Sequence, residues 1–121
     1  MEIRIGTIVI QRGQVPLVRL AGEHDLATEA RVRALLAQAL VGGSSAIVSL
    51  EHVRLLGSSV IGALAAADLV AKRANATLAV VIPERDHPAR RSLELTGVID
   101  SLDVYASITA ARAGIRRRLA R

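Results

Sequence analysis

The chain has 121 residues, no cysteine and a formal net charge of +5. This length is typical of one domain that buries a core without disulfide bridges, and the missing cysteines exclude thiol catalysis and cysteine-ligated metals. With one tyrosine and no phenylalanine or tryptophan, the core must consist of Leu, Val, Ile and Ala. No apolar run approaches the ~20 residues that span a bilayer, so we expect a cytoplasmic protein without membrane insertion.

The excess positive charge lies at the C-terminus. Acidic and basic side chains balance over residues 1–111, and the net charge comes from Arg112, Arg116, Arg117, Arg118 and Arg121. Such a basic tail can contact the phosphates of nucleic acids or lipids, but arginines at a helix end also complement the helix dipole. Because the aromatic side chains that stack on single-stranded bases are nearly absent, we expect a solvated helix end and no nucleic-acid binding.

The hydrophobic pattern predicts strands over residues 3–10 and 15–21, joined by a turn at 11–14, with the second strand ending at Gly22. Apolar residues at helical spacing follow over 25–40, where Asp25 or Thr28 would cap the helix and the glycine pair at 42–43 would stop it. Further strands are predicted at 46–50, 78–82 and 102–105, and further helices at 58–74, 87–96 and 107–119.

The predicted order is therefore β-β-α-β-α-β-α-β-α. Strands that are apolar throughout and alternate with helices are typical of parallel sheets covered on both faces. The sequence thus predicts an α/β fold with a mixed, mostly parallel β-sheet and about four helices packed on it.

The start of the predicted helix at 58–74 is the main candidate for a functional site. Gly57, Ser58 and Ser59 place two hydroxyls at a helix N-terminus, where unpaired backbone N–H groups and the helix dipole favour an oxygen acceptor or an added phosphate. Ser58 is therefore a candidate modification site. The alternative is that Ser58 only caps the helix.

Three segments resemble the STAS domain of bacterial anti-sigma factor antagonists. They are GEHDLAT at 22–28, IVSLEHVRLLGSSVIGAL at 47–64 and RSLELTGV at 91–98, and they occur in the order and at the spacing of that family. The resemblance covers residues 3–114 and implies a STAS-type fold for that range, followed by a basic C-terminal tail at 115–121.

The resemblance implies a protein-binding switch that is not an enzyme. Such antagonists bind an anti-sigma factor that is also a serine kinase, and so free the sigma factor for transcription. The kinase phosphorylates the first serine after the motif aspartate, which ends the interaction, and a phosphatase restores it. The matching position here is Ser58, with Ser59 as the second choice. The sigma factor, the kinase and the oligomeric state stay open.

The same resemblance suggests which residues meet the partner: Glu23, Asp25, Gly57, Ser58, Ser59, Val60 and Leu64. Leu64 and Asp68 would lie on the exposed part of the helix at 58–74. For Asp25, capping of the helix at 25–40 is the leading interpretation.

Three positions differ from the family pattern. Gly57 stands where the motif has aspartate, and Ser49 lacks the carboxylate that usually ends the preceding strand. Val60 stands where the motif has glycine, and we expect its β-branched side chain to crowd the approaching loop of a kinase.

Other chemistry has little support in the sequence. The adjacent residues Glu23, His24 and Asp25 point apart, so we expect no metal site there. His24, His52 and His87 lack the sequence context of a catalytic triad with Ser58, and no phosphate-binding loop is present, so we expect no enzyme and no cofactor. The competing function is a STAS subunit that supports a larger complex, such as a lipid-transport ATPase or a stress-signalling assembly, with Ser58 as a fixed contact.

Overall fold

The structure is a computed structural model that describes residues 7–11, 15–83 and 85–119. Within these residues the elements follow the chain as β1 (Thr7–Gln11), β2 (Leu17–His24), α1 (Glu29–Ala39), the 3₁₀ turn η1 (Val41–Gly43), β3 (Ala46–Leu56), α2 (Ser58–Arg73), β4 (Leu78–Val81), α3 (Pro88–Thr96), the 3₁₀ turn η2 (Val98–Ser101), β5 (Asp103–Tyr105) and α4 (Ile108–Leu119). The isoleucines at 3 and 5 lie outside the described residues, and so does the predicted turn at 11–14 apart from Gln11.

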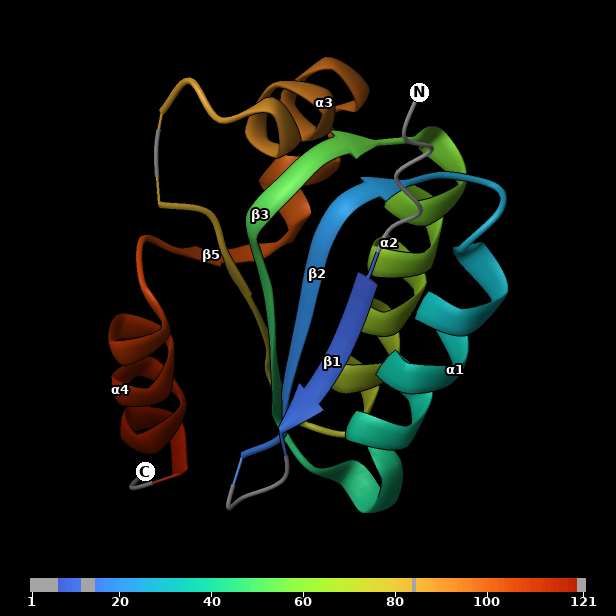
Figure 1. Cartoon of the computed structure of the whole chain (residues 1–121). Helices are drawn as coiled ribbons and strands as arrows, with labels where there is room; N and C mark the ends of the chain where they lie inside the picture. Colours follow the sequence, from blue (N-terminus) through green and yellow to red (C-terminus); the bar gives the residue numbers. More distant parts are fainter. Residues whose placement is uncertain (1–6, 12–14, 84, 120–121) are drawn as a thin grey trace.

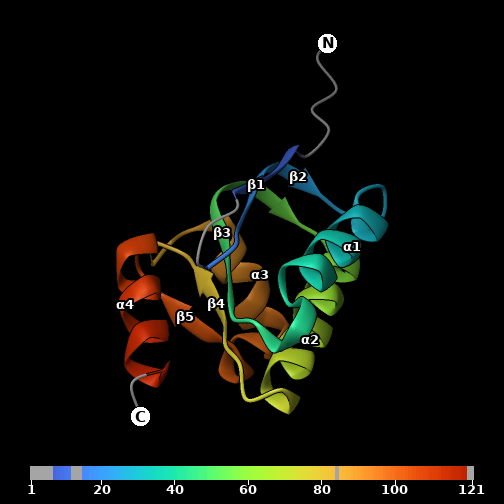
Figure 2. The ribbon, with the colours of Figure 1, turned by 90° about the horizontal axis from the view of Figure 1, so that it is seen from below.

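The five strands form one sheet in the order β1-β2-β3-β4-β5 (Figure 1). β1 pairs with β2 in antiparallel fashion, and the other neighbouring strands are parallel. β3, β4 and β5 each lie beside the preceding strand, on the same side of it. The helices α1, α2 and α3 connect these parallel strands, and connections of the same handedness place all three helices on one face of the sheet. α4 covers the other face (Figure 2). The predicted α/β fold with a mixed, mostly parallel sheet and four α-helices is confirmed.

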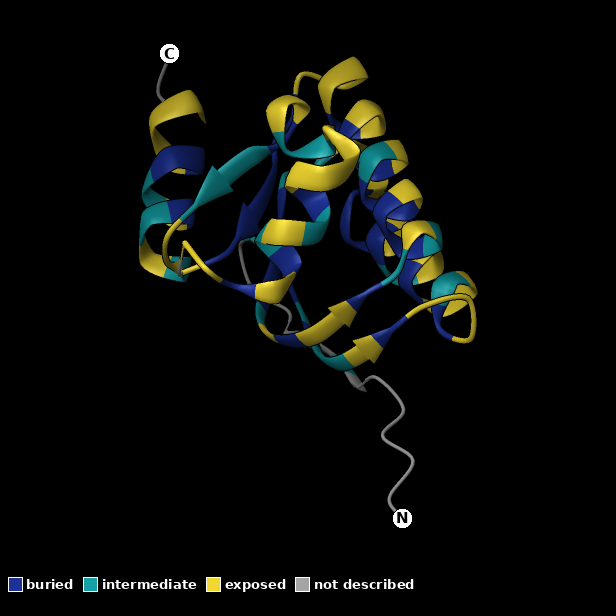
Figure 3. Cartoon of the chain, turned by 90° about the horizontal axis from the view of Figure 1, so that it is seen from above, coloured by how far each residue is buried: buried dark blue, intermediate teal, exposed yellow. Residues whose placement is uncertain are grey.

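Successive side chains of a strand point to opposite faces of the sheet, so the domain has two hydrophobic clusters, one on each face. Val18, Val48 and Val80 point to the face under α1–α3 and belong to the larger cluster. Ile47 and Val81, one residue out of phase, point to the smaller cluster under α4. Residues 46–50 of β3 and all of β4 are therefore buried at every position, because both faces of the sheet are covered there (Figure 3).

The ends of α2 and α3 lie within one residue of the predicted ends at 58–74 and 87–96. Asn75 adopts a positive φ of 56° just after α2, and Pro88 begins α3, which ends at Gly97 with a φ of 76°. The His87 side chain caps α3, because its Nδ1 accepts from the Ala89 N–H at 3.1 Å while its Nε2 donates to the Glu51 carbonyl at 2.8 Å. This side chain ties α3 to the middle of β3.

Two predicted strand ends are wrong. β2 continues past its predicted end at Gly22 to His24, and β3 continues past its predicted end at Leu50 to Leu56. The two extensions pair with each other, with register shifts at either side of the Ala21–Gly22 segment. Polar residues at 51, 52 and 54 read as a connector, but they belong to a strand whose inward positions, Val53 and Leu56, are buried.

Four of the C-terminal arginines, Arg112, Arg116, Arg117 and Arg118, lie on α4, which packs against the sheet. Ile115 of α4 is buried, and the helix extends to Leu119, as predicted. Arg116, Arg117 and Arg118 are exposed in its last turn, where cations complement the helix dipole. Arg118 also donates to the Thr77 hydroxyl at 2.6 Å. No helix within the described residues has the length and apolar character needed to cross a membrane.

The packing of α4 depends on a glycine beneath the single tyrosine. A Cβ atom added to Gly114 would lie 2.6 Å from Cε1 of Tyr105 and would also collide with its hydroxyl oxygen. Gly114 itself is buried in the middle of α4, where glycine is normally unfavourable by ~1 kcal/mol relative to alanine. The close approach of the tyrosine ring offsets this loss.

We therefore expect Gly114→Ala to lower the free energy of unfolding by about 1 kcal/mol, because the methyl group displaces the Tyr105 ring. In a Tyr105→Leu background the same substitution should be neutral or stabilising, by up to about 1 kcal/mol, through helix propensity alone. Urea unfolding followed by circular dichroism of the four chains measures the coupling. A coupling energy near zero would show that the tyrosine does not require the glycine.

Candidate functional site

Ser58 is the first residue of α2 and is exposed to solvent. Gly57 occupies the N-cap position in an extended conformation, so the alternative interpretation, in which Ser58 only caps the helix, is wrong. The first N–H groups of a helix have no partner within the helix, and a glycine cap supplies no side-chain acceptor for them. Within the described residues, the Ser58 hydroxyl likewise makes no hydrogen bond. The helix start thus presents an unpaired hydroxyl beside free backbone donors.

The chain between β2 and α1 packs directly against this helix start. The Gly57 N–H donates to the His24 carbonyl at 2.7 Å. Next to it, the Asp25 carboxylate accepts from the Ala27 N–H at 2.9 Å, which closes a turn that ends at Thr28. Thr28 holds the N-cap position of α1, so the prediction that Asp25 caps this helix is wrong; Asp25 caps the turn before it.

A buried histidine holds that turn in place. The His24 ring is fully buried, with Nδ1 3.0 Å from the Thr28 hydroxyl and Nε2 3.1 Å from the Ala21 carbonyl. A carbonyl only accepts hydrogen bonds, so Nε2 carries the proton in this arrangement. His24 therefore has a structural role that its sequence context, between two acidic residues, did not indicate.

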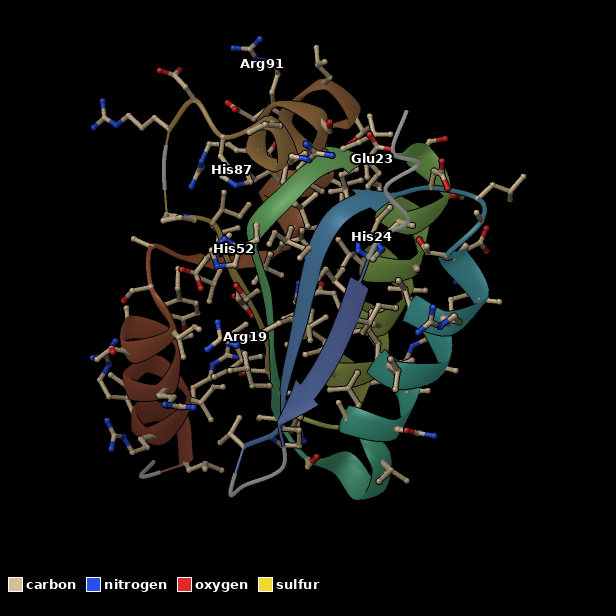
Figure 4. All side chains as sticks on the ribbon, viewed as in Figure 1. Arg19, Glu23, His24, His52, His87 and Arg91 are labelled. Carbon is tan, nitrogen blue, oxygen red and sulfur yellow. The ribbon has the colours of Figure 1, made fainter. Side chains whose placement is uncertain are left out.

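The surface around Ser58 combines one ion pair with exposed leucines. Glu23 and Arg54 approach to 3.8 Å across the ends of β2 and β3, and both side chains are about half exposed (Figure 4). Leu26 is 78% exposed and Leu55 48% exposed. We call Glu23, Asp25, Leu26, Arg54, Leu55 and Ser58 the Ser58 face. The two leucines are functional candidates that the sequence analysis missed, because single apolar residues in irregular segments carry no periodic signal.

Several predicted contact residues point into the core instead. Val60 and Leu64 are fully buried on the inner side of α2, so the expectation that Leu64 is exposed is wrong. Val60 cannot crowd a kinase loop for the same reason. Asp68 is also buried, and its carboxylate accepts from Lys72 at 2.7 Å. Ser59, next to Ser58, is only partly exposed.

The other polar candidates do not converge on Ser58. His24 and His87 each make structural hydrogen bonds, and His52 is exposed on β3, so the three rings lie apart (Figure 4). Ser49 donates to the Glu51 carboxylate at 2.9 Å, so a carboxylate two residues along the strand lies beside it. A search of the described residues finds no group of three side chains that could hold a metal ion.

The sequence of residues 7–111 matches the STAS domain family. This chain belongs to the STAS family. A comparison with curated proteins found no match.

Solved structures share the STAS fold of this chain at low sequence identity. An anti-sigma factor antagonist from Mycobacterium paratuberculosis superposes with a TM-score of 0.75 at 24% identity, over 93% of this chain and 95% of that chain. The anti-sigma factor antagonist SpoIIAA in its unphosphorylated form gives 0.65 at 17% identity, over 93% and 96%. The Bacillus cell fate determinant SpoIIAA in its phosphorylated form gives 0.65 at 16% identity, over 90% and 98%. These likenesses establish the fold.

The STAS fold of this chain explains one departure from the family pattern. A Cβ atom at Gly57 would lie 3.2 Å from both Cα and Cβ of Asp25 and 3.4 Å from the His24 carbonyl oxygen. These distances are shorter than ordinary contacts, and the turn at Asp25 is held by its own hydrogen bonds. Gly57 therefore lets the β2–α1 turn approach the start of α2 more closely than an aspartate at this position would.

We expect Gly57→Ala to lower the free energy of unfolding by about 1 kcal/mol, because the new methyl group pushes the Asp25 turn away. Gly62→Ala is the matched control, since a Cβ there meets only a terminal nitrogen of Arg33 at 3.7 Å. That control should gain up to about 1 kcal/mol from helix propensity. Urea unfolding measures both, and equal effects of the two substitutions would show that the contact at Asp25 is not tight.

Proposed function

We propose that this STAS domain is an anti-sigma factor antagonist-like module that binds an anti-sigma factor with serine kinase activity in the cytoplasm. Phosphorylation of Ser58 ends the interaction, and a phosphatase restores it. The exposed, unpaired Ser58 hydroxyl at the first position of α2 is the observation that carries this proposal. The shared fold with antagonists, one of them solved in a phosphorylated form, supports it.

The position of Ser58 suits a modification that changes docking but not folding. A phosphoserine adds about −1.5 to −2 charges and three acceptor oxygens. Beside the free N–H groups of α2 this charge is tolerated, with a favourable contribution of ~0.3–1 kcal/mol. The domain would therefore stay folded when phosphorylated, and the added charge and bulk would act on whatever contacts the helix start.

The Ser58 face offers the contacts that a protein partner needs. Leu26 and Leu55 provide exposed apolar surface near the serine, and the Glu23–Arg54 pair provides a polar rim. Apolar contacts at the centre with charged groups around them are typical of interfaces that associate and separate. A phosphate placed beside the leucines would have to be desolvated in the complex, which opposes binding.

Gly57 favours a second candidate function, in which the domain is a structural subunit of a larger complex such as a lipid-transport ATPase or a stress-signalling assembly. The carboxylate that the family pattern places beside the serine is missing here. In this case Ser58 would be a permanent contact, and a partner would remain bound whatever the state of the serine.

Incubation with the anti-sigma factor kinase of the native host and ATP should add one phosphate to the wild-type chain, and Ser58→Ala should abolish this transfer. Mass spectrometry of the intact chain measures the modification. Ser59→Ala is the control and should still accept the phosphate, because Ser58 is the more exposed hydroxyl. Circular dichroism should show unchanged unfolding midpoints, since neither hydroxyl belongs to the buried core.

A second experiment measures the affinity of the chain for the same kinase, which is immobilised on a sensor surface. Phosphorylated wild type and Ser58→Asp should bind at least about tenfold more weakly than the unmodified chain, through like-charge repulsion and desolvation. Leu55→Ser should weaken binding without changing the state of Ser58. Equal affinity of the modified and unmodified chains would favour the structural-subunit function, and the phosphoswitch would then be wrong.

A further inference from the structure

α1 and α2 lie side by side and run in the same direction, because each of them connects two parallel strands (Figure 1). A shallow apolar groove of about 300 Å³ between them shows how they are aligned. It is lined by Arg33, Leu36, Ala37, Leu40, Val41, Ala63, Ala66, Ala67 and Val70. The lining begins at Arg33 on one helix and at Ala63 on the other. The first residues of the two helices, Glu29 and Ser58, therefore lie at about the same level.

The guanidinium group of Arg33 reaches across to the first turns of α2. One of its terminal nitrogens lies 3.7 Å from the position of a Cβ atom on Gly62. Gly62 comes one turn after Ser58, and residues four apart are neighbours on one face of a helix, with Cβ positions about 5–6 Å apart. The Cβ position of Gly62 also points toward Ser58, because Cα–Cβ bonds lean toward the N-terminus of a helix. Since glycine has no side chain, Gly62 does not separate the guanidinium group from the serine.

In the unmodified chain, Arg33 has one partner on its own helix. Its Nε donates to the Glu29 carboxylate at 2.7 Å, and the two side chains are 45% and 26% exposed. Exposed ion pairs at this spacing are weak. A guanidinium group has five N–H donors, and within the described residues the terminal nitrogens of Arg33 make no hydrogen bond. Arg33 can therefore exchange this partner for a stronger acceptor.

We propose that Arg33 binds the phosphate of the modified domain: when Ser58 carries a phosphate, the Arg33 guanidinium leaves Glu29 and pairs with that phosphate across the junction of α1 and α2. The exchange rests on the proposed phosphorylation of Ser58 and names the residue that receives the new charge. A phosphoserine has a charge of about −1.5 to −2 and three acceptor oxygens, whereas the Glu29 carboxylate has a single charge. Pairs between arginine and phosphate are frequently bidentate, which strengthens them further.

The carboxylates around the start of α2 make such a partner necessary. Glu23 and Asp25 belong to the Ser58 face, and Glu29 begins the neighbouring helix. Each of these groups repels a phosphate on Ser58. The free N–H groups of α2 compensate part of this repulsion. A cation on the same side of the sheet as α2 is needed for the remainder, and Arg33 is in that position.

The other arginine of this region points the opposite way. Arg54 follows Val53, whose side chain belongs to the cluster under α1–α3. Because successive side chains of a strand alternate, Arg54 points to the other face of the sheet. It also lies 3.8 Å from the Glu23 carboxylate. Arg54 is therefore the matched control for Arg33, since it has the same charge at the same edge of the sheet but faces away from α2.

The exchange extends the effect of phosphorylation to α1. In the unmodified chain, Glu29 and Arg33 neutralise each other. In the phosphorylated chain, Arg33 neutralises part of the phosphate, and Glu29 is left as an unpaired carboxylate at the start of α1. A partner that contacts α1 would therefore meet an added negative charge even where it does not reach Ser58.

The test places phosphoserine at position 58 during translation with an expanded genetic code, so that it needs no kinase. ³¹P spectra recorded against pH give the midpoint of the second phosphate ionisation, which is about pH 6 for a free phosphoserine. A nearby cation favours the dianion, so the midpoint should be lower by about 0.5–1 unit in the wild-type background than in Arg33→Gln. Arg54→Gln should stay close to the wild-type midpoint. A merely structural role of Arg33 would not move this titration.

A third variant tests the exchange itself. Glu29→Gln removes the competing carboxylate and its repulsion, so it should lower the phosphate midpoint further. In ¹⁵N–¹H spectra the Nε–H resonance of Arg33 should move when Ser58 is replaced by phosphoserine, because its acceptor changes. Circular dichroism checks that each chain is folded, as expected for exposed positions outside both hydrophobic clusters.

Three results would overturn the assignment of Arg33. One is an equal phosphate midpoint in the wild-type and Arg33→Gln backgrounds. The second is a rise in midpoint for Arg54→Gln as large as that for Arg33→Gln, which would assign the phosphate to Arg54. The third is a higher midpoint in Glu29→Gln, which would show that Glu29 does not compete.

The outcome is separable from that of the proposed function. A kinase that never modifies Ser58 would disprove the phosphoswitch, while the phosphoserine installed at position 58 would still report on Arg33. Conversely, a phosphate that Arg33 does not bind would leave the effect of phosphorylation on partner docking intact.

Discussion

The site depends on the contact between the ends of two neighbouring parallel strands. β2 and β3 end side by side, and the Gly57 N–H donates to the His24 carbonyl at 2.7 Å, so the β2–α1 turn rests on the first residue of α2. His24 anchors the turn from inside through Thr28 and the Ala21 carbonyl. This arrangement leaves little room for a side chain at position 57 and keeps Ser58 on the surface. Carboxyl ends of parallel strands are where α/β proteins present functional groups, and the candidate site lies at this edge of the sheet.

Three parts of α2 belong to three different surfaces of the domain. Its inner side, with Val60 and Leu64, packs on the sheet and holds the helix in place. Its N-terminus presents Ser58, and its outer side forms one wall of the groove against α1. Because a helix has 3.6 residues per turn, alanines at different points of the turn cover different surfaces, and small residues permit close packing in each direction. An alanine-rich helix can therefore pack closely against the sheet and against α1 at the same time.

The fold could be predicted because its signals are local. Apolar strands, helical spacing and helix terminators such as Gly97 and Asn75 depend on a few neighbouring residues, and the predicted strand at 78–82 and helices at 58–74 and 87–96 are confirmed. Strand ends were less predictable, because the polar stretch after Leu50 forms a strand only through pairing with the end of β2. The site was predicted in part: Ser58 lies at an exposed helix start as expected, while Leu64 turned out to be buried. A list of apolar and small residues on α2 does not show which side faces the sheet.

By itself, the amino-acid sequence determined the order of the elements, the mixed parallel sheet, and Ser58 as a residue at the start of a helix. These properties follow from hydrophobic periodicity and backbone preferences, which act over a few residues. Only the tertiary structure decided that Gly57 is the cap, that His24 is a buried anchor, and that the outer sides of α1 and α2 form an apolar groove. Each of these depends on contacts between segments far apart in the chain, and such contacts leave no periodic signal in the sequence.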